Sequence, residues 1–144
     1  MSLERVRAAV AAMGMLISGT ASADAACTSW DVTGRWTLHQ TNGFSITLDL
    51  VHKAGAVTGT ATHVVSTRDC VKTATCQKRT VSADGSVEGN AFVLTAYWSA
   101  GSIGVYEGQI GAQGRIEGTT FDKRRPSSRA QWHSDRLARC RSAR

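Results

Sequence analysis

The 144-residue sequence lacks several features that would place it in a well-known class of protein. It has 14 glycines but no regular glycine repeat, which excludes a collagen-like fibre. No apolar run reaches the roughly 18 residues that a membrane-spanning helix needs. Hydrophobic residues nevertheless make up 42% of the chain, which is too many for a disordered protein. The composition therefore predicts one globular domain with a single core.

The N-terminus has the three parts of a secretory signal peptide. Arginines precede an apolar stretch at residues 8–17, and small residues follow at 21–23. The apolar stretch is too short to span a bilayer. We therefore expect residues 1–23 to be a cleaved signal peptide and residues 24–144 to form one secreted or periplasmic domain.

All four cysteines lie after the predicted cleavage site. An even number of cysteines in a small exported domain indicates disulfides, with three possible pairings. We favour Cys70–Cys76, which lie in one polar segment, and Cys27–Cys140, which would join the two ends of the mature domain. The spacings do not resemble Cys-x-x-Cys pairs, so we expect no metal site. Lipid attachment at Cys27 is a minor alternative.

Positive charge is concentrated at the C-terminal end. Residues 123–144 carry eight basic residues and one acidic residue, whereas residues 24–122 have a net charge of −2. A basic end can attract nucleic acid or anionic lipid, or it can be a solvated terminus that aids solubility. Few aromatic residues interleave with these charges, so we expect no specific nucleic-acid binding.

Apolar and polar residues alternate through most of the mature chain. Phe44, Ile46, Leu48 and Leu50, for example, are separated by single, mostly polar residues, and dipeptides such as Asp84-Gly85 indicate turns. The alternation predicts eight strands, at about residues 34–41, 43–52, 56–66, 79–83, 86–99 (with a kink near 90), 102–111, 114–122 and 128–135.

Eight strands joined by consecutive hairpins predict an all-β fold, an antiparallel up-and-down barrel. Closure of the barrel would place the first and last strands side by side, and Cys27 and Cys140 flank those two strands. A disulfide between them is then expected to staple the domain. A β-sandwich is the alternative, and its long crossover would have to be the segment around Cys70–Cys76.

Two motifs near the start of the mature chain resemble a known family. Val32-Thr33-Gly34-Arg35-Trp36-Thr37 contains G-x-W, and Gly55-Ala56-Val57-Thr58-Gly59-Thr60 reads G-x-x-x-G-T. This opening resembles the avidin and streptavidin family and, more loosely, the calycin barrels that include lipocalins. The match covers about residues 32–60. The resemblance implies a barrel in which Trp36 packs at the closed end.

The resemblance does not extend to the groups that bind biotin. Leu38 stands where avidins have asparagine, Thr60 and Ala61 stand where they have tyrosine, and Tyr106 replaces a stacking tryptophan. Each lost hydrogen bond would leave a biotin atom unsatisfied at a cost of roughly 1–3 kcal/mol. Biotin binding is therefore not expected.

An eight-stranded barrel is either filled by its own side chains or holds one small ligand. The sequence pattern is compatible with both. If a ligand is held, aromatic residues predicted to line the barrel would suit a small hydrophobic or aromatic molecule. These candidates are Trp36, Phe44, Trp98, Tyr106 and Trp132.

Catalysis has little support in the sequence. Strand parity places His39 and His133 outside the barrel, and His52 and His63 inside but far apart, so no catalytic dyad and no zinc pair follow. No Gly-rich phosphate loop is present. We expect a non-enzymatic binding protein that needs no cofactor.

A role in binding another protein is the alternative. Gly34-Arg35-Trp36-Thr37-Leu38 is also similar to the opening of periplasmic metalloprotease inhibitors, which are small eight-stranded barrels. The N-terminal segment of those inhibitors enters the protease cleft, and residues 24–29 would be the corresponding segment. The predicted outer faces are rich in threonine and polar, so we expect a monomer or a weak dimer.

Overall fold

The computed structural model describes residues 26–64, 79–98 and 101–141. Its strands, in chain order, are β1 (Trp30–Asp31), β2 (Gly34–Gln40), β3 (Ser45–Lys53), β4 (Ala56–Val64), β5 (Arg79–Glu88), β6 (Ala91–Tyr97), β7 (Ile103–Ile110), β8 (Arg115–Asp122), β9 (Arg125–Leu137) and β10 (Arg139–Cys140). Within these residues no helix is long and apolar enough to cross a membrane.

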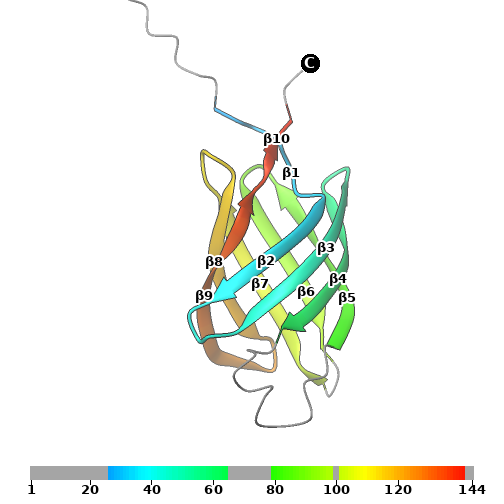
Figure 1. Ribbon diagram of the computed structural model, residues 1–144, viewed down its shortest axis with the longest axis vertical. Helices are drawn as coiled ribbons and strands as arrows, with labels where there is room; N and C mark the ends of the chain where they lie inside the picture. The colour runs from blue at the N-terminus through cyan, green and yellow to red at the C-terminus, as the bar shows by residue number, and fades with distance from the viewer. Residues whose placement is uncertain (1–25, 65–78, 99–100, 142–144) are drawn as a thin grey trace, which may run out of the picture.

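Strands β2 to β9 form a closed barrel in which each strand pairs with its neighbours in the sequence (Figure 1). All pairs are antiparallel, and β2 closes the barrel against β9, where His39 lies opposite His133. The predicted eight-stranded up-and-down barrel is confirmed. The sandwich alternative is therefore wrong.

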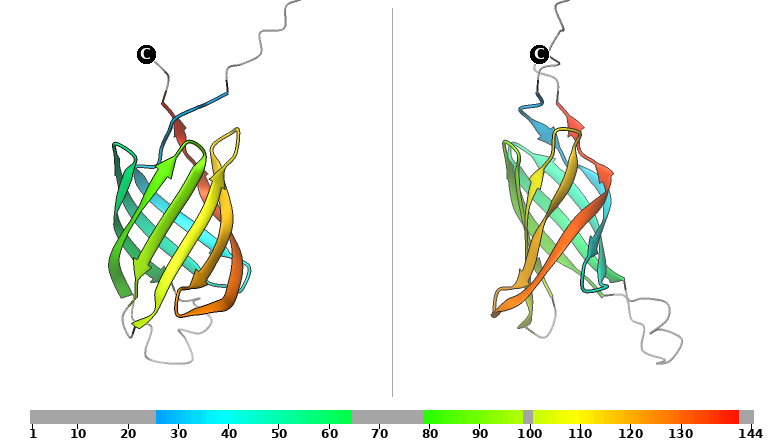
Figure 2. Two further views of the ribbon diagram at one scale, coloured as in Figure 1. Left: turned by 180° about the vertical axis from the view of Figure 1, so that it is seen from behind. Right: turned by 90° about the vertical axis from the view of Figure 1, so that its left-hand side faces the viewer.

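The two ends of the described chain meet beyond one end of the barrel. Trp30 of β1 pairs with Cys140 of β10, and Cys27 forms a disulfide with Cys140 across a Cα–Cα distance of 5.7 Å. Figure 2 shows β1 and β10 leaving the barrel on the same side. The predicted Cys27–Cys140 bridge is confirmed, whereas Cys70–Cys76 and the predicted signal peptide at residues 1–23 lie outside the described residues.

The barrel interior is apolar because every second residue of each strand points inward. Ile46, Leu48 and Leu50 of β3 are buried, as predicted. The end of the barrel near β1 is closed by two tryptophans: the Trp36 indole Nε1 donates to the Val32 carbonyl at 2.8 Å. The Trp30 Nε1 donates to Asn90 Oδ1 at 2.9 Å, so both buried indoles are satisfied.

The boundary between β5 and β6 differs from the prediction. Asp84-Gly85 is not a turn but lies inside β5, where Gly85 pairs with Val57 and with Leu94. A Cβ at residue 85 would overlap the Val93 carbonyl of β6, so the absence of a side chain at Gly85 allows β5 and β6 to approach closely. The turn is at Gly89, with φ of +56°, and joining residues 86–90 to the next strand was wrong.

The basic C-terminal segment is part of the barrel. Residues 125–137 form β9, which pairs with both β8 and β2. Residues 125–137 are therefore not a solvated terminus. Their basic side chains instead lie over the barrel wall: the Arg136 guanidinium carbon is 4.9 Å from the Trp36 ring centroid, and that of Arg129 is 4.6 Å from the Phe121 ring centroid.

Candidate ligand site at the open end of the barrel

The end of the barrel opposite β1 and β10 contains a cavity of about 360 Å³. Its wall includes Gln40 from the end of β2, Ile46 from β3, His63 from β4 and Tyr106 from β7. Several strands thus converge on one concave space. Concave sites that combine apolar walls with a few polar groups are typical of small-molecule binding.

Three aromatic rings follow one another along one side of this opening. The Phe44 and His63 ring centroids are 5.3 Å apart, and the Trp98 ring meets that of His63 edge-on at 6.3 Å. Phe44 is placed at the rim by the Asn42-Gly43 turn, in which Asn42 Oδ1 accepts a hydrogen bond from the Phe44 backbone N–H. We call Phe44, His63 and Trp98 the aromatic row.

The floor of the cavity is polar and centres on Tyr106, which is buried. Gln40 Nε2 donates to the Tyr106 hydroxyl at 3.4 Å, and the side chains of Thr120 and Trp98 also hydrogen-bond it. Burial raises the pKa of the Tyr106 phenol and outweighs these hydrogen bonds, which lower it. The phenol therefore stays neutral at physiological pH.

Gly104 of β7 lets the aromatic row meet this floor. A Cβ at this position would lie 2.8 Å from the Trp98 Nε1 and 3.2 Å from the Tyr106 ring. Any side chain there would displace one of the two aromatic residues. The glycine thus allows Trp98 and Tyr106 to lie side by side.

Asp122 is an acidic residue in the cavity wall, and its carboxylate already has partners. It accepts hydrogen bonds from the Arg124 backbone N–H at 2.9 Å and from Ser102 Oγ at 3.1 Å, and it lies 3.8 Å from Arg125 Nε. The Arg124 N–H is the main cause of a pKa below the usual range for Asp122. The carboxylate is therefore ionised and already engaged.

The structure distributes the five aromatic residues predicted to line a pocket over different parts of the barrel. Phe44 and Tyr106 line the open-end cavity, and Trp98 lies beside it in the aromatic row. Phe44 does not point into the core as predicted, because it precedes β3, which begins at Ser45, and the residue is 50% exposed. Trp36, by contrast, belongs to the closed end.

Trp132 is packed in the middle of the barrel. Its ring centroid is 6.0 Å from that of Phe92 and 6.2 Å from that of Tyr106, and Gly108 gives the indole room. Its Nε1 is buried without a hydrogen-bond partner in the described part of the chain. Trp132 thus supports the cavity floor from behind.

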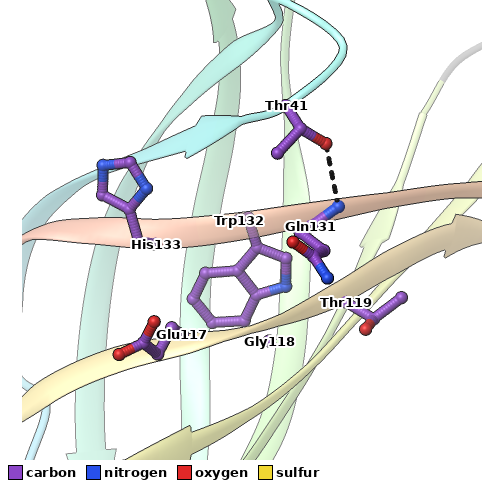
Figure 3. A pocket seen from close by; sticks show the side chains of 7 residues that line it. All are labelled: Thr41, Glu117, Gly118, Thr119, Gln131, Trp132 and His133. Carbon is purple, nitrogen blue, oxygen red and sulfur yellow. Dashed lines mark hydrogen bonds between the residues drawn. The ribbon is translucent and has the colours of Figure 1, made fainter.

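A second hollow, of about 380 Å³, lies on the outside of the barrel over β8 and β9 (Figure 3). Its lining includes Glu117 and His133 on one side of Trp132, and Gln131, whose backbone N–H donates to Thr41 Oγ1 at 3.1 Å, on the other. This hollow rests on two neighbouring strands and one turn. The open-end cavity is lined by residues of β2, β3, β4, β7, β8 and β9, including the buried Tyr106, and is therefore the better candidate site.

The histidines do not form a catalytic or metal-binding cluster in the part of the chain that the structure describes. His39 and His133 lie outside the barrel with ring centroids 5.4 Å apart, whereas His52 is buried near the closed end and His63 lies at the opening. Across the described ranges, no group of three or more histidine, cysteine or acidic side chains is arranged to hold a metal ion.

Sequence reasoning missed the contributions of Gln40 and Arg125 to the cavity. Both residues lie at strand ends on the side of the barrel away from the termini, and this position is the sequence feature that could have identified them.

No family model matches this sequence, and no curated protein matches it.

Proposed function

We propose that this protein is an exported, non-enzymatic binding protein that takes a small molecule into the open end of its barrel. The observation that carries the proposal is the difference between the two ends. Trp30 and Trp36 fill one end, whereas the other holds a cavity of about 360 Å³ above the buried Tyr106. Among the described residues, this end of the barrel leaves space for one small ligand.

The side chains at the opening support a flat, partly apolar ligand. The aromatic row offers ring surfaces for stacking, and the Tyr106 hydroxyl and Gln40 amide offer polar contacts that would fix the orientation of the ligand. Biotin is a poor candidate, since Leu38 and Ala61 are buried in the barrel and present only hydrocarbon.

Export is supported by two observations. The Cys27–Cys140 disulfide is typical of proteins in oxidising compartments. Residues 1–23 have the order of regions found in signal peptides. The two observations together favour a secreted or periplasmic location.

Protease inhibition by the N-terminal segment receives less support. Cys27 is bonded to Cys140, and the Ser29 carbonyl accepts a hydrogen bond from the Arg141 N–H at 2.8 Å. The segment is thus held against β10. Insertion into a protease cleft would require it to leave this position.

The proposal can be tested with the neutral fluorescent probe N-phenyl-1-naphthylamine. We expect saturable binding that weakens in Phe44→Ala, because this substitution removes one ring of the aromatic row. Tyr97→Ala is the matched control, since Tyr97 is an exposed aromatic residue on the outer surface. Native mass spectrometry of protein from its own host should also show a bound small molecule. Absence of both saturable probe binding and a bound molecule would refute the proposal.

A further inference from the structure

Positively charged side chains outnumber negatively charged ones around the open-end cavity. Lys123, Arg124 and Arg125 form the tip of the β8–β9 hairpin, and Arg125 lines the cavity. Asp122 is the acidic residue among the described lining residues, and its oxygens already accept hydrogen bonds from the protein. Donors that can still bind a ligand therefore outnumber acceptors.

Arg125 is the cation best placed to meet a ligand. Its side chain is 79% exposed, and its contact with Asp122 is long, at 3.8 Å. The Asp122 side chain is largely covered, but a contact of this length to an exposed guanidinium contributes little to stability, so the guanidinium can turn towards another anion at small cost. Guanidinium groups match the two oxygens of a carboxylate or sulfonate in a bidentate fashion.

The backbone that carries Arg125 is held by hydrogen bonds, whereas the side chain is exposed and makes only the long contact with Asp122. Ser128 Oγ donates to the Arg125 carbonyl at 2.7 Å and accepts from the Asp122 backbone N–H at 3.1 Å. These bonds hold the hairpin tip in place beside the cavity. A ligand would therefore meet an arginine whose Cα position is already set, which reduces the ordering needed on binding.

We infer that the open end selects an anionic ligand: a molecule with a flat apolar body that enters beside the aromatic row, and a carboxylate, sulfate or sulfonate group that binds Arg125 at the rim. This inference rests on the proposed function and names the chemical class of the ligand. Neutral groups at the floor, such as the Tyr106 phenol, contact the body of the ligand and do not repel its charge.

Two fluorescent probes with the same aromatic body test this inference. 8-Anilinonaphthalene-1-sulfonate carries a sulfonate that N-phenyl-1-naphthylamine lacks. We expect the sulfonate probe to bind wild-type protein about threefold to tenfold more tightly, which is the range of one exposed charge-assisted contact. Its advantage should shrink in high salt because the contact is exposed.

Arg125→Gln should remove the preference for the sulfonate probe and leave the affinity for the neutral probe unchanged. Arg115→Gln is the matched control, since Arg115 is exposed at the start of β8, near the closed end. Phe44→Ala should weaken both probes and so locate them at the open end. Circular dichroism of each variant verifies that the barrel is folded.

The outcomes separate the two proposals. If neither probe binds saturably, the anionic ligand is wrong, and if protein from its own host also carries no bound small molecule, the proposed function fails as well. If the neutral probe binds but the sulfonate gives no advantage, or if Arg125→Gln leaves that advantage intact, the anionic ligand is wrong and the binding cavity stands.

Discussion

The Arg136 guanidinium lies over the Trp36 indole, with 4.9 Å between its central carbon and the ring centroid. Its Nη1 also donates to the Arg35 carbonyl at 3.0 Å. One side chain of β9 thus holds two groups of β2, and β2 and β9 are the strands that close the barrel. Arg136 therefore stabilises the seam, by which we mean the pairing of the first barrel strand, β2, with the last, β9.

Arg136→Ala is expected to lower the free energy of unfolding by about 1–3 kcal/mol, because it removes a cation–π contact and a hydrogen bond. Urea unfolding followed by tryptophan fluorescence measures the change. The control is Arg129→Ala, which removes the guanidinium over Phe121 on the exposed surface and should have a smaller effect. Equal losses in both variants would show that the seam contact has no special role.

The Cys27–Cys140 bridge spans 113 residues of sequence. In the chain-entropy account, closing so long a loop stabilises the folded state by roughly 4–5 kcal/mol. We expect the double variant Cys27→Ser, Cys140→Ser to lose a stability of this order and to keep the barrel, since β2 and β9 pair without β1 or β10. Guanidinium unfolding measures the loss, and far-ultraviolet circular dichroism tests for the barrel. If the variant shows no strand signal in the absence of denaturant, the disulfide is needed to form the barrel and not only to stabilise it.

His52 makes stability depend on pH at the closed end. Burial lowers its pKa below the usual 6.5, the Arg141 charge lowers it further, and Asp31 opposes both. The unfolded chain therefore takes up the proton first, so the free energy of unfolding falls as pH drops from about 6.5. Stability that is fully present above this pH is lost progressively until the folded state also protonates.

His52→Leu should remove this dependence. Neither ring nitrogen of His52 has a hydrogen-bond partner among the described residues, so the substitution breaks no bond. Urea unfolding at about pH 8 and at about pH 5.5 should show a smaller difference for the variant than for the wild type. An unchanged difference would assign the pH dependence to other groups.

Adding a single methyl group at Gly59 of β4 should force β4 away from β3. A Cβ at residue 59 would overlap the Asp49 carbonyl of β3, whereas a Cβ at Gly111 would meet its nearest atom at an ordinary 3.5 Å. We expect Gly59→Ala to destabilise by about 2 kcal/mol or more and Gly111→Ala to be near neutral. Thermal unfolding of both variants, compared with wild type, decides whether close strand approach is the reason for this glycine.

The barrel could be predicted because its information is local. Ile46, Leu48 and Leu50 are separated by single polar or exposed residues in the sequence, and in β3 these three residues are buried while those between them are not. Pairing of Cys27 with Cys140 followed from closure, since an up-and-down barrel must return to its first strand. Each of these inferences needed only the period of the strand and the order of the hairpins.

Two features could not be predicted in this way: the position of the β5–β6 turn and the composition of the cavity. The interpretation of Asp84-Gly85 as a turn is wrong because glycine occurs both in turns and where two backbones approach closely, and the sequence does not distinguish the two uses. Grouping Phe44 with Trp98 through His63 requires the register and tilt of several strands. Neither quantity is encoded in the alternation of any one strand.

The first and last strands of the chain leave the barrel on the side opposite the cavity. A linker that continues from β1 or β10 would therefore start on the side of the barrel away from the proposed ligand site. If the proposed function holds, protein attached to a sensor through such a linker should still bind dissolved compounds.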